Sequence, residues 1–127
     1  MEAVIIITVL ALLQYVYFGY QVGAMRGQTG VKAPATSGDP MFERVNRVHQ
    51  NTLEQLVFVL PVMWIYANAV SPIWAAGFGA IYIIGRFIYS AAYRKDPGSR
   101  SIGFTMSLLP GAIMAGWVLI VAVKTYF

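Results

Sequence analysis

Long stretches without charge dominate the chain and predict its secondary structure. Residues 3–25 contain no charged side chain, although Glu2 precedes them and Arg26 follows. At about 1.5 Å per residue, a helix of this length crosses a hydrocarbon core of roughly 30 Å. The stretch has no basic segment before it and is longer than the apolar part of a signal peptide, so we expect a membrane helix that is retained.

A second charge-free stretch, residues 55–85, is too long for one crossing and is expected to divide in two. Ser71 can cap the second of these helices, and Pro72 suits its first position, where the missing N–H is not needed. A further apolar stretch, residues 101–123, ends at Lys124. The pattern therefore predicts one all-α domain over residues 1–127, a membrane bundle of four helices near residues 3–25, 41–69, 72–95 and 100–124.

Composition supports an integral membrane protein. Of the 127 residues, 58% are hydrophobic and only 11% are charged, which is too few charges to cover a soluble protein of this size. Cysteine is absent, so a disulfide framework, a thiolate metal site and a cysteine nucleophile are excluded, and a single histidine argues against a metal cluster. Any thiol chemistry must therefore use a thiol that arrives with the substrate.

Lysines and arginines are distributed unevenly between the two ends of the expected bundle. Lys124 lies at the end that carries both termini, and the remaining cations lie at or near the first and third loops: Arg26, Lys32, Arg44, Arg47, Arg86, Arg94, Lys95 and Arg100. The positive-inside rule predicts that these loops face the cytoplasm and that both termini lie on the other side. The net charge of +4 then needs no nucleic-acid partner, because no basic face is interleaved with stacking aromatic residues.

Polar side chains form a stripe on the second expected helix. Spacings of three and four residues place on one helical face Arg44, Arg47, Asn51, Glu54 and Phe58. Glu54 would lie about 15 Å along the helix from Arg44, at a depth where an unpaired carboxylate costs several kcal/mol. We therefore expect Glu54 to pair with Arg86 or with Arg47. Such a pair can also be purely structural and fix the register of two helices without a ligand.

The third expected helix carries a similar stripe, formed by Tyr82, Arg86, Tyr89 and Tyr93. One interpretation is topological, since arginines near helix ends reach the interface and tyrosines anchor helices there. The alternative is that both stripes line one pocket that opens toward the cytosol. Its guanidinium, amide, carboxylate and phenol groups would suit an anionic or zwitterionic ligand, and a γ-glutamyl tripeptide has that charge pattern.

At these positions the sequence resembles the MAPEG family, the membrane-associated proteins in eicosanoid and glutathione metabolism. The matching segments are FERVNRVHQNTLEQ, which begins at Phe42, and GRFIYSAAYRKDPGSRSIGF, which begins at Gly85. The resemblance implies a homotrimer that binds glutathione between subunits near the cytosolic side, with Arg26 reaching the ligand of the neighbouring subunit. It implies that the glutathione-binding residues are Arg26, Arg47, His49, Asn51, Glu54, Arg86, Tyr89 and Tyr93.

The resemblance also implies an activity and a catalytic residue. Arg100 resembles the arginine credited with activating the thiol of glutathione, which would attack lipophilic electrophiles that arrive through the bilayer. Lipid hydroperoxides are among the candidates and would give a peroxidase activity. The role is physically sensible, because a free thiol with a pKa of about 8.5 is mostly protonated at neutral pH, whereas a guanidinium and a helix N-terminus favour the thiolate.

The sequence departs from the family pattern at two positions. Gln55 stands where some relatives have a tyrosine, and Gly27 stands where the members that make leukotrienes have a second arginine. These departures favour a general detoxifying transferase, and the short loops and low charge fit a compact bacterial member of the family.

Two other interpretations remain open. A non-catalytic MAPEG-like protein that binds lipid or acts as a scaffold would keep the fold without the thiol-activating arginine. A small subunit of a transporter or respiratory complex would use intramembrane arginine and glutamate for ion relay or assembly. The latter has less support, because residues 55–85 and 101–123 carry no charge that could continue a polar path to the far leaflet.

Overall fold

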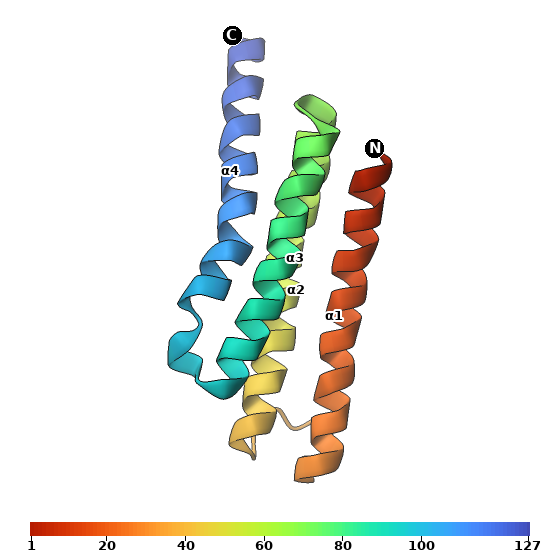
Figure 1. Cartoon of the computed structure of the whole chain (residues 1–127), viewed down its shortest axis with the longest axis vertical. Helices are drawn as coiled ribbons and strands as arrows, with labels where there is room; N and C mark the ends of the chain where they lie inside the picture. Colours follow the sequence, from red (N-terminus) through yellow and green to blue (C-terminus); the bar gives the residue numbers. More distant parts are fainter.

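A computed structural model describes all 127 residues and confirms the all-α prediction. The chain forms the helices α1 (Glu2–Thr29), α2 (Pro40–Ala69), α3 (Pro72–Lys95) and α4 (Ser101–Tyr126), with a short 3₁₀ turn, η1 (Pro97–Ser99), between the last two. All four α-helices are long and apolar enough to cross a membrane. They run side by side along the long axis, and both termini lie at the same end (Figure 1).

Local capping explains where α2 and α3 begin. Asp39 accepts hydrogen bonds from the backbone N–H groups of Met41 and Phe42, with Pro40 at the first position of α2. The hydroxyl of Ser71 accepts from the N–H of Trp74 and starts α3, as the sequence predicts. The four predicted segments correspond to the four helices, and their bounds differ by at most two residues except at the end of α1.

The end of α1 lies further along the chain than expected. The helix continues past Arg26 to Thr29 and stops at Gly30, whose φ of 78° lies in the left-handed region that glycine adopts without a Cβ clash. The predicted end at residue 25 is too early because a charged side chain ends the apolar stretch without ending the helix.

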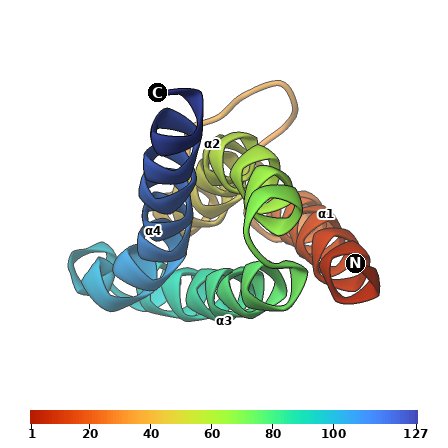
Figure 2. The same ribbon diagram turned by 90° about the horizontal axis from the view of Figure 1, so that it is seen from above.

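The helices α2 and α3 lie between α1 and α4 when the bundle is seen along its axis (Figure 2). They are also the more enclosed pair. Of the residues in the apolar stretches of α2 and α3, 39% and 44% are buried, against 22% in α1 and in α4. Polar groups that must be kept from lipid are therefore best accommodated where α2 faces α3.

Two glycines allow α3 and α4 to approach each other closely. Lipid is as apolar as leucine, so helices in a membrane associate through tight packing and not through escape from water. A Cβ on Gly85 would lie 2.8 Å from the backbone carbonyl carbon of Met106, and a Cβ on Gly103 would collide with the backbone of Tyr89. The contact fixes the beginning of α4 against the second half of α3, and thereby positions Arg100.

The half of the bundle near the termini has an apolar core. Val4, Met63, Ala75 and Met114 pack together there from all four helices. The buried arginine, Arg86, lies instead in the half that carries residues 30–39 and η1.

Candidate functional site

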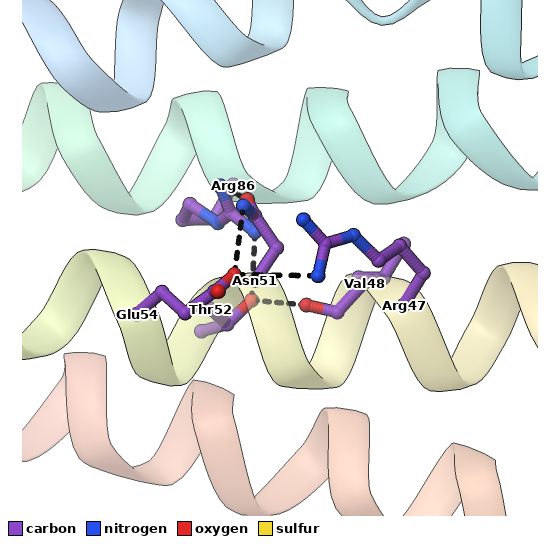
Figure 3. A network of polar contacts seen from close by, with 6 residues as sticks. All are labelled: Arg47, Val48, Asn51, Thr52, Glu54 and Arg86. Carbon is purple, nitrogen blue, oxygen red and sulfur yellow. Dashed lines mark hydrogen bonds and ion pairs between the residues drawn. The ribbon is translucent and has the colours of Figure 1, made fainter. Parts of the chain in front are cut away.

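Arg86 is the largest fully buried side chain of the protein, with 0% of its surface exposed. From α3 its Nη1 donates to Oδ1 of Asn51 over 2.9 Å, and its Nη2 donates to the hydroxyl of Thr52 over 2.9 Å (Figure 3). Its guanidinium carbon also lies 4.4 Å from the centre of the Tyr89 ring. A buried cation is costly without such partners, so these contacts explain how α2 and α3 enclose it.

Asn51 links this buried cation to an ion pair on the outer side of α2. Because Oδ1 accepts from Arg86, the amide nitrogen is free to donate to Oε1 of Glu54, which lies 3.4 Å away. Nη1 of Arg47 also lies 3.4 Å from Oε1 of Glu54, and the side chains of this pair are 48% and 59% exposed respectively. The network therefore runs from buried Arg86 to two side chains that are about half exposed, and Figure 3 shows its contacts.

The partner of Glu54 is Arg47, which is one of the two arginines predicted for it. The other candidate, Arg86, is held by neutral groups and forms no ion pair with Glu54. Thr52 is a partner that the sequence analysis does not include, because the analysis follows a stripe of charges. Its hydroxyl donates to the carbonyl of Val48 over 2.7 Å, which leaves an oxygen lone pair for Arg86.

Two tyrosines extend the site along α3. The rings of Tyr89 and Tyr93 stack with centres 5.5 Å apart, and Tyr89 lies 6.4 Å from the ring of Phe104 on α4. Phe104 is also a wall of an open hollow of about 530 Å³, lined by Gly98, Arg100, Ser101, Phe104 and Thr105. The hollow therefore adjoins the tyrosine pair through one shared aromatic side chain.

Arg100 stands immediately before α4 and lines this hollow. Its Nη1 donates to the carbonyl of Pro97 over 2.9 Å, within the same turn, and the residue is exposed. The guanidinium and the free N–H groups of the first turn of α4 thus bring positive potential to one place. An anion in the hollow would be stabilised by both.

Two of the predicted ligand-binding residues have other partners within the chain. Arg26 donates from Nη1 to the carbonyl of Ala35 over 2.8 Å, and its guanidinium carbon lies 4.7 Å from the centre of the Phe42 ring. His49 stacks on Tyr15 of α1, with ring centres 4.5 Å apart and an angle of 17°. Neither forms a hydrogen bond or ion pair with the Arg86 network inside one chain.

Arg44, which shares the stripe on α2, has a structural role. Its Nη1 donates to the carbonyls of Arg94 and Lys95 over 3.0 and 3.4 Å, at the carboxyl end of α3. A cation at this end satisfies helix carbonyls that have no N–H partner.

The structure contains no group of three or more His, Cys, Asp or Glu side chains that could hold a metal ion.

Comparison with known proteins identifies the family of this chain. The model of the MAPEG family matches residues 4–120. The chain is 41% identical to an uncharacterized protein of Synechocystis sp. over 109 residues, which cover 86% of this chain and 80% of that protein. It is 34% identical to microsomal glutathione S-transferase 2 of Homo sapiens over 102 residues, covering 80% and 69%. It is 31% identical to leukotriene C4 synthase of Rattus norvegicus over 127 aligned positions, covering 86% and 85%.

A family match over almost the whole chain, together with four helices able to span a bilayer, identifies the class of protein. The chain is an integral membrane protein that belongs to the MAPEG family.

Proposed function

We propose that this protein is a membrane-bound glutathione transferase. The observation that carries the proposal is the network from buried Arg86 through Asn51 to the half-exposed Glu54 and Arg47. The network presents a cation, an amide and a carboxylate on one side of α2. The names of two relatives also support the proposal, since one is a microsomal glutathione S-transferase and the other is a leukotriene C4 synthase.

Glutathione has chemical groups that match these side chains. It carries two carboxylates and one ammonium group, and an arginine can hold a carboxylate through two parallel hydrogen bonds. We assign a carboxylate of the ligand to Arg47 and its ammonium group to Glu54. The hydroxyls of Tyr89 and Tyr93 supply further donors on α3.

A second subunit would complete this site. Arg47 and Glu54 face out of the chain, so a ligand held by them lies where another subunit can close over it. We propose a homotrimer, in which Arg26 leaves the carbonyl of Ala35 and reaches the ligand of the neighbouring subunit. His49 would approach the ligand with the edge of its ring while its face stays on Tyr15.

Arg100 is the residue that we assign to catalysis. Placed beside the sulfur, its guanidinium and the N-terminus of α4 would favour the thiolate, and each unit of pKa depression corresponds to about 1.4 kcal/mol. The thiolate sulfur then forms a bond to an electrophilic carbon while a halide leaves, or while an epoxide C–O bond opens and its oxygen takes a proton. A groove at the membrane supplies the proximity that dilute reactants lack.

A peroxidase reaction would use the same thiolate. The sulfur attacks the terminal oxygen of a lipid hydroperoxide, the O–O bond breaks, and an alcohol and a glutathione sulfenic acid result. A second glutathione then reduces the sulfenic acid, giving the disulfide and water.

The distribution of cations supports an orientation. At the end of the bundle that carries residues 30–39 and η1 lie Arg26, Lys32, Arg44, Arg94, Lys95 and Arg100, whereas the end with both termini has Lys124. We propose that the site faces the cytoplasm and that both termini lie on the other side.

The test uses detergent-purified protein, glutathione and a chromogenic aryl halide. Arg100→Ala is expected to bind glutathione and lose conjugation, whereas Glu54→Ala weakens binding itself. Lys124→Ala, at the opposite end of the bundle, is the control and should match the wild type. Wild-type protein that binds glutathione without conjugating any electrophile would favour a non-catalytic lipid-binding or scaffold protein, and the absence of binding would remove the proposal.

A further inference from the structure

Four buried polar atoms near the middle of the bundle have no hydrogen-bond partner in the protein. They are Oε1 of Gln14, Oε1 of Gln55, the hydroxyl of Tyr82 and Nε of Arg86. The four residues are 4%, 9%, 1% and 0% exposed respectively. A bilayer offers no water to such atoms, so leaving them unpaired opposes folding.

The packing of three helices brings these four residues within about one helical turn of one another along the bundle axis. Arg86 meets Asn51 and Thr52, and α2 and α3 are antiparallel. One turn further along α2 is Gln55, and one turn earlier along α3 is Tyr82, so these two residues lie at the same height. Gln14 reaches this height from α1, because its Nε2 donates to the carbonyl of Ile83 over 2.9 Å.

The unpaired atoms are chemically complementary. The Nε–H of Arg86 is a donor, the two glutamine oxygens are acceptors, and a tyrosine hydroxyl can be either. Tyr82 also packs against Ala11 of α1 and Leu56 of α2, which places its ring among all three helices. A buried water typically makes about three hydrogen bonds to groups of this kind.

We propose that internal water bridges these side chains, and that Gln14 and Tyr82 are positioning residues of the glutathione site. The inference rests on the proposed function for its second half. Water bound to the Nε–H of Arg86 holds the third side of the guanidinium, while Asn51 and Thr52 hold the other two nitrogens. The plane of the guanidinium then sets the direction of the Asn51 amide, and through it the place of Glu54.

Binding measurements test the positioning role. Tyr82→Phe removes one hydroxyl and no ring atom, and it should raise the Kd for glutathione by roughly threefold to tenfold, the loss expected for one neutral hydrogen bond. Conjugation at saturating glutathione should stay close to the wild-type rate, because Arg100 is untouched. Gln14→Met, of similar length, should show the same split between affinity and rate.

Tyr66→Phe is the matched control. Tyr66 is also buried, at 4% exposure, but it belongs to the apolar core near the two termini. Its variant should leave the Kd unchanged. A Kd that stays at the wild-type value in both Tyr82→Phe and Gln14→Met would overturn the positioning role.

X-ray hydroxyl-radical footprinting tests the water directly, because it modifies a buried side chain only where ordered water lies against it. Tyr82 should be modified in wild-type protein and Tyr66 should not, although both are buried. An unmodified Tyr82 would overturn the internal water. Failure of wild-type protein to bind glutathione would instead remove the proposed function, while the footprint would still report on the water.

Discussion

Arg86 and Asn51 join the interior of this protein to its surface through one hydrogen bond of 2.9 Å between α3 and α2. Only an amide can accept from a guanidinium with its oxygen and donate to a carboxylate with its nitrogen at the same time. Asn51 does both, since its nitrogen lies 3.4 Å from Oε1 of Glu54. The bond therefore makes a buried cation determine how an exposed carboxylate is held.

Replacing the amide of Asn51 by a carboxylate separates these two functions. Asn51→Asp still accepts from Arg86, so the folded protein should survive. It cannot donate to Glu54, and it brings a second negative charge beside that carboxylate, so the Kd for glutathione should rise by about tenfold or more. Calorimetric titration measures this change. Asn68→Asp, on the exposed end of α2, is the control, and equal affinities in the two variants would contradict the role of the amide.

The shape of the guanidinium should matter as well as its charge. Arg86→Lys keeps a cation but cannot reach both Asn51 and Thr52 with a planar fork. We expect the free energy of unfolding to fall by about 2–4 kcal/mol, because buried polar groups lose charged partners, and glutathione binding to weaken. Thermal unfolding in detergent is the readout, with Arg94→Lys as the control. A midpoint that matches the wild type would show that the fork is dispensable.

Glu54 should contribute to binding far more than to stability. Its ion pair with Arg47 is half exposed, and such pairs contribute about 0.2–1 kcal/mol. Glu54→Gln should therefore leave the unfolding temperature almost unchanged while glutathione affinity falls by roughly tenfold, since a charged hydrogen bond to the ammonium group is lost. Glu43→Gln is the control. The carboxylate of Glu43 accepts from the N–H of Gly38, and its replacement should leave the affinity for glutathione unchanged. Loss of stability in Glu54→Gln without loss of affinity would indicate a structural pair.

The approach of α4 to α3 should control catalysis from a distance. Gly103→Ala places a methyl group against the backbone of Tyr89, so α4 must move and carry Arg100 with it. We expect a lower unfolding temperature and slower conjugation. Gly116→Ala, in the same helix with no atom within 4 Å of the new methyl group, should be neutral or stabilising by up to about 1 kcal/mol. Equal behaviour of the two variants would show that the close contact is unimportant.

The helices could be predicted from the sequence because their signal is one-dimensional. Charge-free stretches and the Ser71 and Pro72 pair mark spans and turns without any knowledge of packing. The end of α1 was not predictable in this way, because Gly30 ends the helix and Arg26 does not. Spacing of three and four residues likewise brought Arg47, Asn51 and Glu54 together on one face, as the structure shows.

The rotation of each helix about its axis could not be predicted in the same way. Whether Glu54 or Thr52 meets Arg86 depends on which of two neighbouring faces of α2 turns toward α3, and both are plausible from periodicity. The hydrogen bond from Arg26 of α1 to the carbonyl of Ala35 depends on how residues 30–39 fold back, which no periodic pattern encodes.

The most direct test of the central claim is a titration of glutathione into detergent-purified protein, followed by the ultraviolet absorbance of the thiolate about two pH units below the ordinary thiol pKa of about 8.5. The heat of binding is measured in the same titration. The account predicts that wild-type protein gives saturable thiolate absorbance. It predicts that Arg100→Ala gives binding heat without that absorbance. Wild-type protein that gives neither heat nor thiolate absorbance would contradict it.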